Sequence, residues 1–147
     1  MTERIVSASR LVNADAAAIF ELIADPAQHP TWDGNDNTAE AQDPQRVTAV
    51  GDVFVMRNTS DKIRDNHVVE FEEGRLIAWK PGAIGEDRPG HLWRWQLTPT
   101  KDGTLVTHTY DWTGLNPNDE KRNERARNTT ADNLQASVDR LAELAEG

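Results

Sequence analysis

The sequence predicts an α+β fold in which a curved antiparallel sheet of about seven strands wraps around a long C-terminal helix, with two short helices after the first strand. Three observations predict it. Strand-like segments with short connections fill most of residues 36–112, which favours an antiparallel meander. An amphipathic helical pattern follows them. Trp93 and Trp95 occupy alternate positions of one strand and therefore lie on the same face of the sheet, as if it enclosed a helix or a cavity.

The N-terminal elements are a strand and a helix pair. A strand is expected over residues 4–12. Ile19, Phe20 and Ile23 then recur at helical spacing, and Asp25-Pro26 ends that helix. Only a short second helix fits between Pro26 and Trp32.

Strands fill the middle of the chain. Alternation and turn residues place the strands at 36–42, which is the weakest, 52–59, 64–73, 75–80, 91–99 and 103–112. Chains of 147 residues are a natural size for one domain, so we expect a single domain over 1–147.

One long helix is expected at the C-terminal end. Asn116-Pro117 supplies an N-cap and a proline at the first helical position. Leu134, Val138 and Leu141 recur at spacings of three and four residues. A helix over 118–146 would be on the order of 40 Å long, so it must lie across the sheet.

Composition excludes several classes of function. The chain has 16 Lys and Arg against 25 Asp and Glu, a net charge of −9, which argues against nucleic-acid binding. It contains no Cys, so it has no disulfide and no thiol nucleophile. With no signal peptide visible and no apolar run near ~20 residues, we expect a cytoplasmic protein without membrane insertion, as a monomer or weak homodimer.

Local patterns along nearly the whole chain resemble a known superfamily. They are NADAAAIFELIADP (13–26), HPTW (29–32), VGDVF (50–54), VVEFEEGRLIAW (68–79), WRWQL (93–97) and GTLVT (103–107). In this order they resemble the START-like or SRPBCC superfamily, with its helix-grip fold, and in particular the polyketide cyclase/dehydrase-like branch. The resemblance implies a deep apolar cavity between sheet and long helix. Members include lipid and sterol carriers, hormone receptors, allergens and aromatase/cyclases, so activity has to be argued from the site.

Alternation predicts which side chains face that cavity. In the last strand the polar series Thr107, Thr109 and Asp111 points outward, which turns His108 and Tyr110 inward. A three-residue turn with Gly74 at its left-handed position would bring Ile77 and Trp79 inward, and a two-residue turn would bring Leu76 and Ala78. We prefer the first, because it buries the larger side chains. The predicted ligand-binding residues are Trp32, Phe54, Asn58, His67, Val69, Trp79, His91, Trp93, Trp95, His108, Tyr110, Arg127, Ala131 and Leu134.

Simpler interpretations compete with this pocket. Trp93 and Trp95 would also suit direct packing on the C-terminal helix, and Trp32 would suit a cap on the core. The inward histidines come from separate strands without metal-ligand spacing, so neither a metal nor another cofactor is expected.

The leading hypothesis is a protein that binds a hydrophobic small molecule, aromatic or sterol- or polyketide-like, because flat aromatic walls suit such ligands. An alternative is a metal-free enzyme resembling polyketide aromatase/cyclases, with His67, His108, Tyr110 and Arg127 as candidate acid–base groups. A protein-interaction module without ligand is the third hypothesis.

Overall fold

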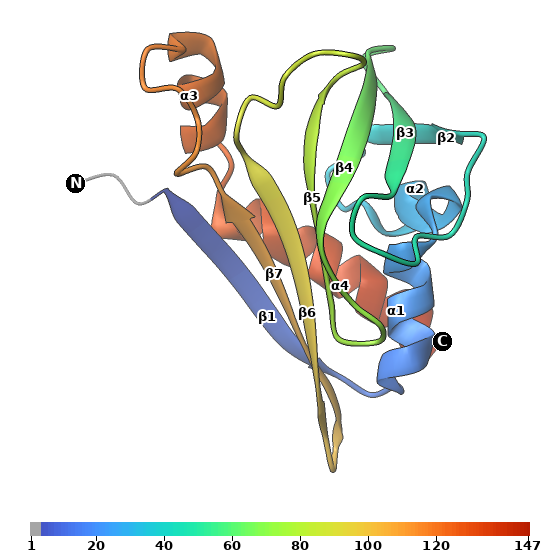
Figure 1. Ribbon diagram of the computed structural model, residues 1–147. Helices are drawn as coiled ribbons and strands as arrows, with labels where there is room; N and C mark the ends of the chain where they lie inside the picture. The colour runs from blue at the N-terminus through green and yellow to red at the C-terminus, as the bar shows by residue number, and fades with distance from the viewer. Residues whose placement is uncertain (1–3) are drawn as a thin grey trace.

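The computed structural model describes residues 4–147 and has the predicted α+β helix-grip architecture (Figure 1). The helical elements are α1 (Ala16–Ala24), the 3₁₀ turn η1 (Pro26–Gln28), α2 (His29–Trp32), α3 (Glu120–Arg127) and α4 (Ala131–Glu146). The strands are β1 (Ile5–Val12), β2 (Thr38–Gln42), β3 (Val53–Asn58), β4 (Ile63–Glu72), β5 (Leu76–Ala83), β6 (Leu92–Thr100) and β7 (Gly103–Asp111).

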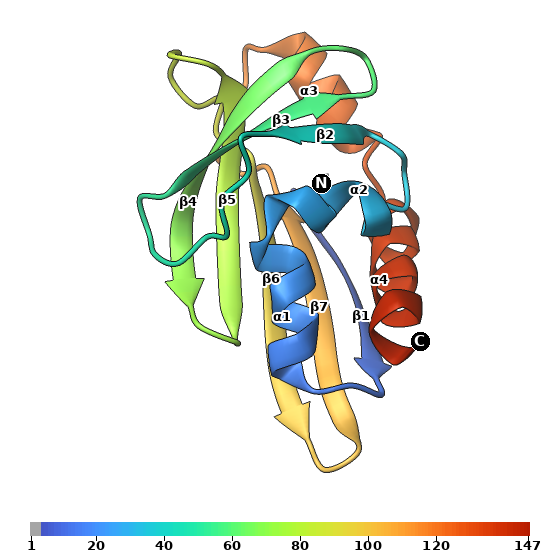
Figure 2. The same ribbon diagram turned by 90° about the vertical axis from the view of Figure 1, so that its right-hand side faces the viewer.

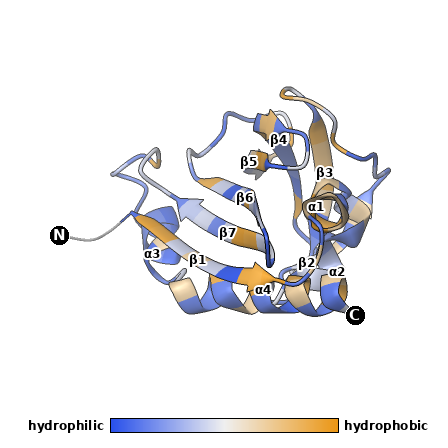
Figure 3. Cartoon of the chain, turned by 90° about the horizontal axis from the view of Figure 1, so that it is seen from below, coloured by the Kyte–Doolittle hydropathy of each residue, from blue (hydrophilic) through white to orange (hydrophobic). Residues whose placement is uncertain are grey.

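All seven strands form one antiparallel sheet in the order β1-β7-β6-β5-β4-β3-β2. The first and last strands in the chain pair with each other, so β2 to β6 extend away from them as a meander. Seen from below, the sheet is an arc with α4 lying across its β1–β7 side (Figure 3). α1 and α2 stand inside the other side of the arc (Figure 2).

The core lies where these helices meet the sheet. Ile19, Phe20 and Ile23 of α1 are at most 1% exposed, as their helical spacing predicts. Leu134, Val138 and Leu141 form the buried stripe of α4. This half of the molecule is close-packed, because helix and sheet side chains fill it from both sides.

The C-terminal segment forms two helices, so the prediction of one continuous helix is wrong. α3 ends at Arg127 and α4 begins at Ala131. Between them, Thr130 and Asn133 each accept a hydrogen bond from the other's backbone N–H, which is a capping box. Asn and Thr side chains compete for backbone groups and favour such a break. Within residues 4–147 no helix is long and apolar enough to cross a membrane.

A bulge in β4 changes which of its side chains face the cavity. The pairing with β5 passes from Val68 directly to Glu70, which leaves Val69 as an inserted residue. Val68 is therefore buried and Val69 is 37% exposed, whereas Phe71 still packs on the core. The prediction that His67 and Val69 point inward is wrong, because strict alternation does not hold across an inserted residue.

The turn after β4 is the predicted three-residue turn. Glu72 pairs with Leu76, and Gly74 has a φ of 76°, a left-handed conformation that favours glycine. Ile77 and Trp79 are buried as a result.

The link between α2 and β2 presses directly on α4. A Cβ on Gly34 would lie 2.4 Å from the carbonyl carbon of Ala136, so only glycine fits there. The Gly34 N–H donates to Ser137 Oγ at 3.0 Å, and the Asn35 side chain bonds to the Asn133 carbonyl at 2.8 Å. This contact holds the end of α2, and with it Trp32, against the helix.

Candidate functional site: a cavity with a closed and an open end

A cavity of about 850 Å³ lies between the concave face of the sheet and the helices. β3 to β7 supply one wall, and α2, α3 and α4 supply the other. Its volume falls within the usual range for sites that bind small molecules.

Tightly packed aromatic side chains form the closed end of the cavity. Trp95 is fully buried, and Trp32 approaches it edge-on with ring centroids 5.2 Å apart. The His108 ring stacks on Trp95, with centroids 3.8 Å apart and planes 14° from parallel. The register explains this pair, because His108 lies directly opposite Trp95 on β7. Trp32 is fixed further by its indole N–H, which donates to the Leu22 carbonyl at 2.7 Å.

A second aromatic group continues this wall toward β3. His29 stacks on Trp79 at 5.3 Å, and Phe54 meets both rings edge-on at 5.2 Å. These geometries are the favoured ones for aromatic pairs, so the group is a rigid surface.

Trp93 stands further along the cavity and is only partly buried. Its ring centroid lies 4.3 Å from that of Tyr110, and Tyr110 lies 6.0 Å from His91. The paired tryptophans therefore differ. Trp95 fills the core, whereas Trp93 lines the open space.

The cavity histidines are held neutral. Burial lowers the pKa of His108 to about 3 and the pKa values of His29 and His91 to about 4. Hydrogen bonds to carbonyls fix two tautomers, because a carbonyl only accepts. His108 Nδ1–H donates to Arg94 O at 3.1 Å, and His29 Nε2–H donates to Ile23 O at 2.7 Å. The remaining nitrogen of each ring is an acceptor.

Two further polar groups lie at the aromatic wall. The indole nitrogen of Trp95 is buried and has no hydrogen-bond partner within residues 4–147. An unpaired buried donor is unfavourable, and this one is enclosed by the packed side chains of the closed end. Burial also raises the pKa of Tyr110 to about 12, which keeps its hydroxyl protonated.

The open end has a different composition. Exposed residues of the β3–β4 turn, such as Lys62, line the cavity there, together with Asn128 and Thr129 after α3. Arg122 and Arg125 line it from α3 itself. In Figure 1 this end lies at the top, between α3, the β5–β6 loop and the β3–β4 turn.

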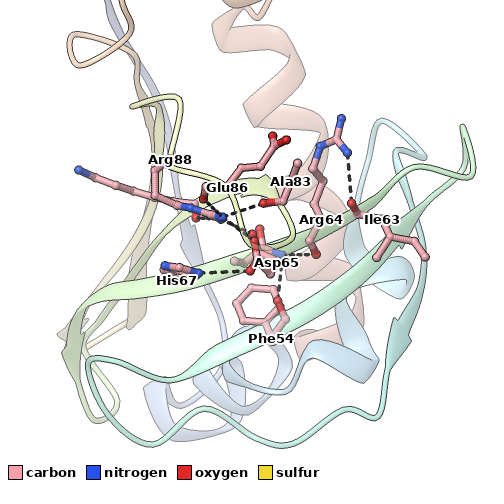
Figure 4. Close-up of polar contacts among 10 residues, drawn as sticks. Phe54, Ile63, Arg64, Asp65, His67, Ala83, Glu86 and Arg88 are labelled. Atoms are coloured by element: carbon pink, nitrogen blue, oxygen red, sulfur yellow. Dashed lines mark hydrogen bonds and ion pairs between the residues drawn. The ribbon is translucent and has the colours of Figure 1, made fainter.

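The β5–β6 loop beside this opening is anchored on the outer face of the sheet (Figure 4). Arg88 pairs with Asp65 at 2.7 Å, and its guanidinium also donates to the carbonyls of Ala83 and Glu86. His67 Nε2 lies 3.3 Å from the other oxygen of Asp65, outside the cavity. Together these contacts tie loop and strand into one rigid unit.

Comparison with known proteins agrees with this architecture. A family model described as "polyketide cyclase / dehydrase and lipid transport" matches residues 3–146. The chain belongs to this family. Uncharacterized protein Rv0088 of Mycobacterium tuberculosis is 34% identical over 112 residues, covering 73% of this chain and 47% of that protein. The chain therefore spans about half the length of the curated relatives it matches.

Solved structures share the fold at low sequence identity. Protein MLL2253 from Mesorhizobium loti superposes with a TM-score of 0.70 at 17% identity, covering 96% of both chains. DynU16, a putative protein in the dynemicin biosynthetic locus, superposes with a TM-score of 0.68 at 19% identity, covering 98% of this chain and 48% of that one. Both likenesses concern the fold alone.

Within this member of the family, most of the predicted residues come together. Those that line the cavity are Trp32, Phe54, Asn58, Trp79, His91, Trp93, Trp95, His108, Tyr110 and Leu134. Those that do not are His67, Val69, Arg127 and Ala131. The bulge in β4 removes the first two, and the break between α3 and α4 removes the others. Arg127 lines a separate polar hollow with Arg4 and Trp112, and Ala131 is exposed in the first turn of α4.

Several cavity residues were missed. His29 is 3% exposed and lies at the centre of the aromatic wall. It could have been predicted, because it precedes Trp32 by three residues on one short helix and so shares its face. Arg122 and Arg125 were missed because the helix was expected to be continuous. The Thr130-x-x-Asn133 pattern was the signal that would have placed the break. Within residues 4–147, no group of three or more His, Cys, Asp or Glu side chains is arranged to hold a metal ion.

Proposed function

We propose that this protein binds an apolar, ring-containing small molecule in the cavity, against Trp93, Tyr110 and the edge of the Trp95–His108 stack. One observation carries the proposal. The cavity has a volume of about 850 Å³ and flat aromatic faces along its wall, and Trp93 on that wall is only partly covered. Burying a planar ring against such a face removes a large apolar area from water.

The polar groups at the wall suit recognition of the ligand. The protonated Tyr110 hydroxyl is a donor, and the free ring nitrogen of His108 is an acceptor. A few such groups in an apolar pocket fix the orientation of a ligand and its specificity.

A polyketide cyclase-type reaction is the second candidate, and it is supported by the Tyr110 hydroxyl as a donor to a substrate carbonyl. The titration behaviour favours binding instead. Efficient proton transfer needs a pKa near the working pH, whereas His108 has a pKa of about 3 and Tyr110 of about 12. The third hypothesis, protein interaction without ligand, leaves the cavity without a role.

The test uses a neutral fluorescent ring compound, 1-pyrenebutanol, titrated into the purified protein while energy transfer from tryptophan is followed. We expect saturable binding with a Kd on the order of micromolar. Absence of saturable binding by the wild-type protein would overturn the proposal.

Two neighbouring substitutions provide the matched pair. Asn58→Trp projects a large side chain into the cavity and is expected to weaken binding about tenfold or more. Arg57→Trp changes the adjacent residue, which pairs with Glu40 and Asp61 outside the cavity, and is expected to leave the Kd unchanged. Equal loss in both variants would show that binding is elsewhere.

A further inference from the structure

Cationic side chains gather at the open end of the cavity, although the chain as a whole carries a net charge of −9. Lys62 and Arg64 reach it from the β3–β4 hairpin, and Arg122 and Arg125 reach it from α3. Among residues 4–147, the single carboxylate that lines the cavity is that of Asp33.

The arginines face a common region. Arg122, Arg125 and Thr129 are spaced by three and four residues, so they share the side of α3 and its end that faces the cavity. Arg64 lies on the concave side of β4, before the bulge. Burial is the largest cause of the lowered pKa of His91, and the charges of Arg122, Arg125, Arg64 and Arg88 lower it further, so this end of the cavity is electropositive.

Three of these four cations lack a counter-ion within the described residues. In the described residues, no carboxylate lies within 4.0 Å of the charged groups of Lys62, Arg64 or Arg125, and the Arg64 guanidinium donates only to the Ile63 carbonyl at 3.1 Å. Arg122 alone is paired, with Asp119 at 2.7 Å.

The carboxylate of Asp33 is already occupied within its own loop. It accepts hydrogen bonds from the backbone N–H groups of Asn35, Asn37 and Thr38 and from the Thr38 hydroxyl. By contrast, Arg46 and Arg94 on the outside of the molecule each pair with glutamates.

We propose that the ligand is an amphipathic oxyanion, with its ring body on the aromatic wall and its carboxylate or phosphate group between Lys62, Arg64 and Arg125. This rests on the function proposed above and names the chemistry of the ligand. The deep end holds neutral histidines and apolar rings, where an unpaired anion would be costly. The open end combines partial hydration with guanidinium groups that match an oxyanion.

The experiment compares two probes that differ only in this head group, 1-pyrenebutyrate and 1-pyrenebutanol. We expect the acid to bind about tenfold more tightly than the alcohol at low ionic strength. This advantage should shrink in about 0.5 M NaCl, because salt screens the attraction between the arginines and the oxyanion. Dodecanoate and dodecyl phosphate should both displace the probe better than dodecanol, and their order tells the two oxyanions apart.

The double variant Arg64→Gln/Arg125→Gln should bring the acid-to-alcohol ratio close to one without weakening the alcohol. The single variant Arg125→Gln should lose part of the ratio, and its matched control is Arg127→Gln, which also removes one positive charge from the last turn of α3 but lines a separate hollow. It should keep the wild-type ratio.

The outcomes separate the two proposals. Equal binding of acid and alcohol by the wild-type protein overturns the oxyanion and leaves the binding function standing. An Arg127→Gln variant that loses as much of the ratio as Arg125→Gln also overturns it, because general charge would then explain the preference. If neither probe binds, the binding function itself fails.

Discussion

The two ends of the cavity differ in burial, polarity and charge. At the closed end Trp32 and His108 each pack on Trp95, and all three are at most 5% exposed. At the open end the lining is polar, cationic and carried by a turn, a loop junction and the short helix α3.

β6 shows the change residue by residue. Trp95 is fully buried, Trp93 two positions earlier is partly exposed, and His91 just before the strand has a pKa that is lowered by nearby arginines as well as by burial. Alternate residues of a strand share a face, so these three side chains follow one another along the cavity, with Trp95 in the core, Trp93 at the proposed binding surface and His91 near the entrance. Stability and recognition are therefore separated along the strands, and substitutions at the two ends should have different consequences.

The largest effect is expected from Trp95→Ala at the closed end. Removing a fully buried indole leaves a cavity, so the free energy of unfolding should fall by about 3–5 kcal/mol. Trp93→Ala, on the same strand and face, should cost only about 1–2 kcal/mol because its side chain is partly exposed. Urea denaturation followed by far-ultraviolet circular dichroism measures both, and similar losses would contradict the distinction between the ends.

The next effect is the loss of stability in acid. Unfolded histidine has a pKa near 6.5, whereas His108 in the folded protein has a pKa of about 3. As the pH falls, the unfolded state therefore takes up a proton before the folded state does. The stability that neutral His108 contributes is fully present above about pH 6.5 and is lost as the pH falls toward 3. Between pH 7 and pH 4, His108 alone should lower the free energy of unfolding by about 3 kcal/mol.

Substitution isolates that contribution. His108→Phe keeps a ring opposite Trp95 and removes the titrating group, so the difference in stability between pH 7 and pH 4 should shrink by about 3 kcal/mol relative to wild type. Tyr110→Phe is the control on the same strand, because the pKa of Tyr110 is about 12 and it does not titrate in this range. An unchanged pH dependence in His108→Phe would refute the assignment.

The fold was predictable because its signals are local and repeat along the chain. Helical spacing placed α1 and the stripe of α4, and alternation placed β6 and β7 with the correct faces. The glycine at position 74 decided the turn between β4 and β5, since a left-handed residue was needed there. Each of these features depends on residues within one element or one turn.

The site was less predictable because irregular structure at two points, a bulge and a helix break, changes which side chains face the cavity. One extra residue at Val69 turns His67 outward, and three residues between α3 and α4 replace Arg127 by Arg122 and Arg125 at the cavity. Neither change alters the hydrophobic pattern on which the prediction rests. The bulge depends on pairing with β5, which single-strand alternation does not contain, whereas the helix break carries a local signal in its capping box.

The smallest effect is expected from Trp93→Leu, and it separates the two ends most directly. Leucine keeps an apolar side chain on the strand but removes the flat ring that stands beside Tyr110. We expect the Kd for 1-pyrenebutanol to rise about tenfold, which corresponds to about 1.4 kcal/mol. The free energy of unfolding should change by less than about 1 kcal/mol, because the position is only partly buried.

The contrast with Trp95 makes this result interpretable. Tryptophan-to-pyrene energy transfer weakens with the loss of any donor, so the Kd is taken from the midpoint of the titration and not from its amplitude. If Trp93→Leu lowered the free energy of unfolding as strongly as it raised the Kd, the ring would be part of the core, as Trp95 is. A weakened Kd in a protein of nearly wild-type stability would instead support Trp93 as a surface kept for the ligand.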